Sequence, residues 1–293
     1  MTLALTLPVT LAVLFGALLH ASWNALIKSS TDKSLDTALI HVMGTVLALP
    51  LLLLAGLPPV DSMPYLAASI VIHIGYYIAL AGAYKHGELG LTYPIMRGLA
   101  PLLVALGSGA LIGEHLSWLG WAGVAGVSGG VLLVGLSRSA LPHASHRPAI
   151  IFALSNAVII ALYTVVDGLG VRVATASGGS ALQYVAALFL IDGLPYFVLV
   201  MSQRSGQQRI DAWDYMRKRW PLALLGTIAS LGSYGIALWA MTQAPVAIVA
   251  ALREVSVLFA AILGAWLLKE SFGMQRATGT LLIVGGVAAL RLA

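Results

Sequence analysis

The sequence contains no cysteine and very little charge. Only 9% of its 293 residues are Asp, Glu, Lys or Arg, whereas a soluble domain carries about 25%. Without cysteine, disulfides, thiolate metal sites and a cysteine nucleophile are excluded. The scarcity of charge, together with 59% hydrophobic residues and a mean hydropathy of +0.94, indicates a polytopic membrane protein.

Several functional motifs are also missing. The sequence has no HExxH, no Walker motif and no pair of acids on one interior helix face, which argues against an intramembrane enzyme and against a built-in ATP-driven pump. Rings of like charge and the carbonyl-lining motifs of channels are missing too. The expectation is therefore no enzymatic activity, no cofactor and no metal. The net charge of +5 lies mostly between apolar segments, so it predicts a lipid bilayer, not a nucleic acid, as the partner.

Ten apolar segments are long enough to cross a membrane as helices, and no linker between them is long enough to fold alone. The sequence therefore predicts an all-α membrane domain. The expected spans are residues 7–27, 36–56, 64–84, 91–112, 118–136, 149–173, 180–201, 220–241, 246–268 and 272–292.

Basic residues alternate from loop to loop. Of the 16 Lys and Arg residues, 12 lie in the loops after spans 1, 3, 5, 7 and 9. Arg172 and Arg291 lie on the opposite side, and Arg97 and Arg253 lie inside spans. Because basic loops stay in the cytoplasm, both termini are predicted to lie outside the cytoplasm.

The second half of the sequence repeats the first with a shift of 156 residues. The shift relates Arg97 to Arg253, Glu114 to Glu270, and Gly123 to Gly279. Each repeat holds five spans, and an odd number turns the second copy upside down, as in many secondary transporters. We therefore predict two inverted repeats, residues 1–141 and 142–293, that together form one membrane domain.

Two loop corners, "GEHLS" and "KESF", each precede a glycine-rich helix. This doubled pattern resembles the EamA-type repeat of the drug/metabolite transporter superfamily. The stretch "YKHGELGLTYPIMRGLAPLL" also resembles YddG-type amino-acid exporters. The resemblance implies a basket of ten helices around a central cavity, export of a small molecule and a place in the bacterial cytoplasmic membrane. Glu114 and Glu270, at the corners, are expected to cap the helices that follow them.

Polar residues at helical spacing are expected to face the interior, because lipid cannot satisfy them. Where they share a stripe near the middle of a span, they are candidates for contact with substrate. The candidates are Trp23, Asn24, His73, Tyr77, Tyr93, Arg97, Tyr163, Tyr234 and Trp239. Asp167 shares the stripe of Tyr163 but is not among the candidates.

Arg97 has two interpretations. Its planar fork suits a carboxylate or phosphate of a substrate, and a buried acid, Glu254 or Asp192, would equally satisfy it. Pro94 and Pro101 are expected to bend or break the helix around Arg97. For Arg253, Glu254 and Asp192 a structural or gating role is expected, with proton carriage as a further role for Asp192.

The interpretation that fits these features best is a secondary transporter for a small polar metabolite. We expect it to export amino acids, including aromatic ones, by alternating access. The short connection between residues 84 and 91 predicts that spans 3 and 4 are neighbours, so that Tyr77 and Arg97 share a cavity. Transport of another metabolite or a drug is the main alternative. An intramembrane enzyme and a channel are less favoured alternatives. The oligomeric state is left open, a monomer included.

Overall fold

The structure is a computed structural model that describes residues 5–136, 147–268 and 273–293, with the side chains of residues 89 and 264–268 left aside. Glu270 and the predicted boundary between the repeats at residues 141 and 142 lie outside the described residues. The first half forms α1 (Leu7–Lys28), α2 (Lys33–Ala55), the 3-10 turn η1 (Val60–Ser62), α3 (Met63–His86), α4 (Leu89–Ile112) and α5 (Trp118–Gly135). The second half forms α6 (Arg147–Ala176), α7 (Ala181–Ser202), α8 (Gln207–Met241), α9 (Val246–Arg253), α10 (Val255–Leu268) and α11 (Met274–Leu292).

All ten predicted spans are helical, and the all-α prediction is confirmed. Among the described residues, nine helical segments are long and apolar enough to cross a membrane, with α9 and the start of α10 counting as one. The tenth, α11, has 19 residues and packs along α5. Short polar side chains begin several of the helices because they accept hydrogen bonds from otherwise unpaired N–H groups. Thr6, Asp32, Ser117 and Ser180 cap α1, α2, α5 and α7 in this way.

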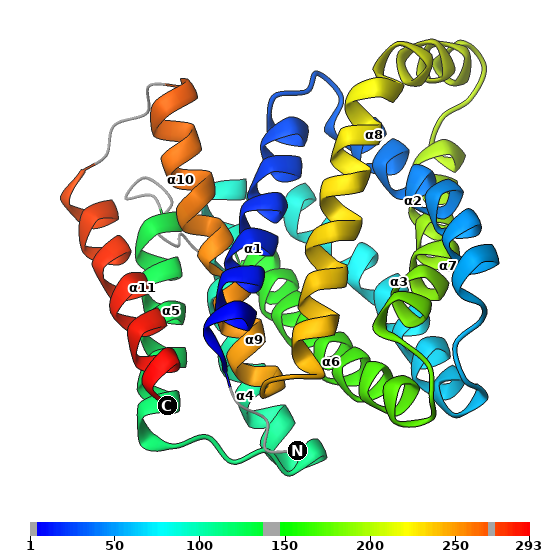
Figure 1. Cartoon of the computed structure of the whole chain (residues 1–293). Helices are drawn as coiled ribbons and strands as arrows, with labels where there is room; N and C mark the ends of the chain where they lie inside the picture. Colours follow the sequence, from blue (N-terminus) through cyan, green and yellow to red (C-terminus); the bar gives the residue numbers. More distant parts are fainter. Residues whose placement is uncertain (1–4, 137–146, 269–272) are drawn as a thin grey trace.

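The packing of the helices follows the two predicted repeats. Helix α1 packs on α8, and its counterpart α6 packs on α3; α2 pairs with its own counterpart α7, and α5 with its counterpart α11. If each helix is replaced by its counterpart in the other half, these helix pairs are therefore recovered. Figure 1 shows α5 and α11 at one edge and α2 and α7 at the other, with both termini at one end of the bundle.

The prediction that spans 3 and 4 are neighbours is wrong. Helix α3 packs along α6 and α7 and barely touches α4. Small residues allow this arrangement, because a Cβ atom added at Gly82 of α3 would collide with Phe152 of α6. A short connection fixes where two helices meet, but it does not make them run side by side.

Two further boundaries differ from the sequence prediction. The segment before span 8, read as a linker, is helical from Gln207 and belongs to α8. Figure 1 shows this first part of α8 turned across the end of the bundle opposite the termini. Pro221 lies inside α8, one residue after the predicted start of span 8 at residue 220. A proline inside a helix removes one helical hydrogen bond.

The expected break in span 4 is found in span 9 instead. Helix α4 continues through both Pro94 and Pro101. In span 9, α9 ends at Arg253 and α10 begins at Val255, although neither half contains an internal proline. The residue in the turn between them, Glu254, is charged and buried, and its contacts are described below.

Glycines bring α5 and α11 into close contact. A Cβ atom at Gly130 would lie 2.6 Å from the carbonyl oxygen of Gly279, whereas a Cβ atom at the adjacent Gly129 would meet nothing within 4 Å. The close approach replaces the hydrophobic driving force that is absent between helices in lipid.

We therefore expect Gly130→Ala to destabilise the fold by about 1–3 kcal/mol, the cost of overpacking a tight contact. Gly129→Ala is the matched control, since it changes helix propensity equally and adds no clash. The measurement is the thermal unfolding midpoint of both purified variants in the same detergent. Equal midpoints would show that the contact between α5 and α11 tolerates an extra methyl group.

Candidate functional site

Arg97 and Glu254 form an ion pair in the middle of the bundle. The Arg97 Nε atom lies 2.8 Å from Glu254 Oε2, and the two side chains are 9% and 6% exposed. The contact is not aligned as a hydrogen bond, so the fork of the guanidinium group is not engaged in the bidentate manner that it prefers. Of the two acids that the sequence offered to Arg97, the structure pairs it with Glu254, not with Asp192.

The break between α9 and α10 places Glu254 in this pair. Glu254 lies in the turn between the two helices, and its N–H group bonds back to the carbonyl oxygens of Ala251 and Leu252. Irregular backbone at membrane depth is tolerated only where it is buried in protein or lines a polar interior. The break therefore marks the polar centre of the fold, where the discontinuous helices of transporters place their sites.

A small cavity lies between α4, α6 and α9. It has a volume of about 10 Å³, and Arg97, Tyr163, Arg253 and Glu254 are among its lining residues. This volume is enough for about one water molecule, whereas small-molecule pockets measure roughly 300–1,000 Å³. The cavity lies between the two halves, since α4 belongs to the first half and α6 and α9 to the second.

Aromatic side chains surround the centre. The ring of His73 stacks on that of Tyr163 with 4.4 Å between centroids, and Tyr76 approaches Tyr163 edge-on at 6.0 Å. The His73 Nδ1 atom donates to the carbonyl oxygen of Ser69 at 2.8 Å, because a carbonyl only accepts. Tyr93 packs against the same cluster. His73, Tyr93 and Tyr163 are thus brought together, as the polar stripes predicted.

Helix α1 supplies the other side of the centre. The His20 Nε2 atom lies 3.4 Å from a terminal nitrogen of Arg97, and the Trp23 ring meets the His20 ring edge-on at 5.2 Å. The Asn24 amide donates to the carbonyl oxygen of His20, so that donor is used within the helix. His20 was not among the candidates, although it shares their stripe.

Three of the predicted residues lie elsewhere. The Tyr77 hydroxyl donates to Asp192 Oδ2 at 2.8 Å, and the Tyr77 ring contacts those of Tyr196 and His41. Tyr77 and Asp192 therefore form a cluster with α2 and α7. The contact of the Tyr77 and Tyr76 rings, 5.4 Å between centroids, joins this cluster to the central aromatic residues. Trp239 on α8 is 40% exposed and lies at the surface of the bundle.

A buried carboxylate that the candidate set omitted lies beside Tyr234. Asp167 is fully buried and accepts hydrogen bonds from the hydroxyls of Tyr184, at 3.1 Å, and Tyr234. The Arg253 guanidinium lies over the Tyr234 ring, 5.0 Å from its centroid. The shared stripe with Tyr163 was the available sequence signal for Asp167, and Tyr234 connects it to the central charges.

Comparison with known proteins agrees with this architecture. The pattern of the EamA-like transporter family matches residues 147–292. The chain therefore belongs, through its second half, to the EamA-like transporter family. A solved structure titled "Crystal structure of protein" superposes with a TM-score of 0.75 at 22% identity, over 97% of this chain and 98% of that one, so the two share a fold along their whole length. The comparison with curated protein sequences found no match.

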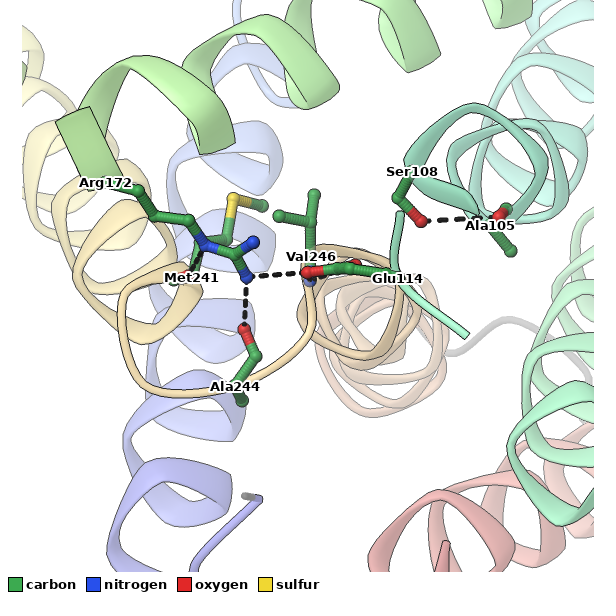
Figure 2. Close-up of polar contacts among 7 residues, drawn as sticks. All are labelled: Ala105, Ser108, Glu114, Arg172, Met241, Ala244 and Val246. Carbon is green, nitrogen blue, oxygen red and sulfur yellow. Dashed lines mark hydrogen bonds and ion pairs between the residues drawn. The ribbon is translucent and has the colours of Figure 1, made fainter. Parts of the chain in front are cut away.

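In this EamA-like protein, a polar latch closes the end of the bundle where the termini lie. Figure 2 shows Arg172 of α6 donating to Glu114 Oε1 at 2.6 Å and to the carbonyl oxygens of Met241 and Ala244. Both oxygens of Glu114 accept from the N–H group of Val246 at 3.0 Å. Glu114 was expected to cap the helix that follows it, α5; it caps the start of α9 instead. We call Glu114 and Arg172, with the backbone groups that they bind, the latch.

Two ion pairs lie at the opposite end of the EamA-like fold. Arg219 pairs with Asp36 at 2.5 Å, and Arg204 pairs with Asp32 at 3.0 Å. Partial burial opposes ionisation of Asp32, but hydrogen bonds from Ser34 and the backbone, together with Arg204, hold the pKa of this carboxyl below its ordinary value. The pairs fasten the first part of α8 and the end of α7 to the start of α2.

We expect Arg172→Gln to destabilise the protein by about 3 kcal/mol, because it leaves the carboxylate of Glu114, 8% exposed, without its cation. The double variant Arg172→Gln/Glu114→Gln should recover part of this loss, since no charge then stays buried alone. Arg291→Gln is the control on the same side, because Arg291 donates to one carbonyl, that of Leu5.

The measurement is the free energy of unfolding of the three variants in detergent. A double variant that is less stable than Arg172→Gln would contradict the explanation in terms of an unpaired buried charge.

Proposed function

We propose that the protein is a secondary transporter that exports a small metabolite with a carboxylate group, most simply an amino acid, by alternating access. The observation that carries this proposal is the placement of Arg97: a guanidinium group buried between the two halves, at a helix break, beside aromatic rings. Intramembrane ionisable groups mark substrate paths more often than they stabilise a fold.

The geometry of the ion pair supports a carboxylate substrate. Glu254 approaches Nε of Arg97, and His20 lies 3.4 Å from one terminal nitrogen. A substrate carboxylate that took the place of His20 at the terminal nitrogens would find the bidentate arrangement that Arg prefers. The rings of Tyr93, Tyr163 and His73 offer apolar faces and polar edges to a side chain. An amino acid combines a carboxylate with such a side chain.

The small size of the central cavity supports alternating access. A substrate does not fit into about 10 Å³, so binding requires the helices around Arg97 to part. The exchange symmetry of the helix pairs supports two opposite openings, because inverted repeats adopt each other's conformation in turn. A drug or another organic cation, attracted by Glu254, is the second candidate substrate.

We further propose that the protein lies in the bacterial cytoplasmic membrane with both termini outside the cytoplasm. The positive charges support this orientation, because the end of the bundle away from the termini carries most of them. Ser177, next to α6 on the side of the termini, and Ser205, between α7 and α8, are both exposed.

The sequence lacks cysteine, so single cysteines report on topology without background. We expect Ser177→Cys to react with a membrane-impermeant maleimide in intact cells, and Ser205→Cys to react only after the cells are permeabilised. Measured labelling of the reverse pattern would overturn the orientation while leaving the fold untouched.

Transport itself is tested by counterflow in proteoliposomes. Vesicles loaded with unlabelled phenylalanine, threonine, a sugar or an organic cation are given the same compound in radiolabelled form outside. We expect counterflow of the amino acids. Arg97→Ala should lower it by roughly 10–100-fold, the loss of a hydrogen bond to a charged group, and Arg97→Lys should restore little, because a point charge does not replace the fork.

Arg209→Gln is the control, because Arg209 lies on the exposed first part of α8 and should leave counterflow unchanged. Normal counterflow by a correctly inserted Arg97→Ala protein would remove Arg97 from the substrate site. Counterflow of the organic cation alone would favour the second candidate.

A further inference from the structure

Asp167 is a carboxylate deep in the bundle whose hydrogen-bond partners are all hydroxyl groups. Its exposure is 0%, and it accepts at Oδ1 from Tyr184 of α7 and at Oδ2 from Tyr234 of α8. Among the residues that the structure describes, Asp167 forms no ion pair, in contrast to Glu254, Glu114, Asp36 and Asp32.

Hydroxyl partners make this carboxylate different from the paired acids. A guanidinium group only donates, so it holds an acid in the ionised form. A hydroxyl both donates and accepts, so the same two groups can satisfy Asp167 with or without a proton. Burial of an unpaired charge is costly in the interior of a membrane protein, which gives the site a reason to exchange protons when its access to water changes.

We propose that Asp167 is the proton-binding site of the transporter, and that export of one substrate molecule is coupled to the entry of one proton that binds there. This inference rests on the proposed transport function. In the coupling step a proton from the aqueous phase adds to a carboxylate oxygen of Asp167, and the hydroxyl of Tyr234 rotates from donating to accepting. The proton leaves toward the other side of the membrane after the helices have rearranged.

Tyr234 connects this proton site to the proposed substrate site. Its hydroxyl is bound to Asp167, and its ring lies under the guanidinium group of Arg253. Arg253 precedes Glu254 at the helix break, and Glu254 holds Arg97. A change in charge at Asp167 therefore acts through the Tyr234 side chain on Arg253, next to the turn between α9 and α10.

The other titratable groups near Asp167 are accounted for. His73 of α3 interacts with Asp167 electrostatically, and its Nδ1 proton is bound to the backbone of Ser69. On α6 itself, Tyr163 stacks on His73. Arg253 of α9 faces Tyr234, and Arg97 of α4 is compensated by Glu254. Of the groups facing Asp167, His73 is thus the one whose titration must be separated from it.

The first test needs no substrate. Infrared difference spectra of the reconstituted protein, recorded while the pH is lowered, should show the band of a carboxyl group becoming protonated. This band should be missing from Asp167→Asn and present in His73→Gln and in Asp192→Asn, since Asp192 is the matched intramembrane carboxylate with a tyrosine donor. An unchanged titrating band in Asp167→Asn would overturn the proposal.

The second test separates coupling from transport. With labelled phenylalanine as the probe, an acidic vesicle interior should drive uptake by the wild type. Asp167→Asn keeps an acceptor oxygen for one of the two tyrosine hydroxyls and donates from its NH2 group to the other, as the protonated acid would. Its phenylalanine counterflow without a pH gradient should therefore stay within about three-fold of the wild type, while uptake driven by the gradient falls at least ten-fold. Uptake by Asp167→Asn that still follows the gradient would overturn the proposal.

If Asp167→Asn loses both counterflow and gradient-driven uptake, the proposal is also overturned. Asp167 would then be a structural link between α6, α7 and α8. Absence of phenylalanine counterflow in the wild type would instead contradict the proposed amino-acid substrate. The infrared titration would still decide whether Asp167 binds a proton.

Discussion

The charge of Arg97 must be compensated inside the protein, because neither lipid nor bulk water reaches it, and much of the architecture follows from that constraint. Glu254 supplies the compensation from the other half of the chain. To present Glu254, span 9 is interrupted between α9 and α10. This one ion pair joins the two repeats at their interface. Around it lie the interruption in span 9, the aromatic side chains of α3 and α6, and His20 of α1.

The two repeats are alike in packing but differ in chemistry at this point. The shift of 156 residues places Glu254 opposite Gly98. A Cβ atom at Gly98 would collide with the side chain of Leu132 on α5, so the first repeat needs a glycine where the second carries an acid. Helix α4 is continuous despite two prolines, whereas span 9 is interrupted without one. The asymmetry creates a site with two arginines and a single compensating acid at its centre.

The sequence was sufficient to predict the helices, because the length of each apolar segment is a local signal. The repeated arginines, Arg97 and Arg253, and the loop corners "GEHLS" and "KESF" are local signals too. The sequence was also sufficient to place His73, Tyr93, Arg97 and Tyr163 near one another, since lipid forces polar stripes inward. It failed where the outcome depended on which helices pack together. Tyr77 is one residue from Tyr76 and the two rings touch, yet the Tyr77 hydroxyl bonds to Asp192 and not to a group of the central cluster. The sequence also left the partner of Arg97 open between Glu254 and Asp192. Asp167 was visible on a stripe, but its two hydroxyl partners come from two other helices, α7 and α8.

The ion pairs at the two ends of the bundle constrain motion differently. Arg219–Asp36 and Arg204–Asp32 lie within one packed group, α2, α7 and α8, so this group can move as a unit without breaking them. The latch joins the end of α6, the corner before α5, the end of α8 and the start of α9 through one guanidinium and one carboxylate. Opening at that end requires all these contacts to part together, with two charges left to be solvated.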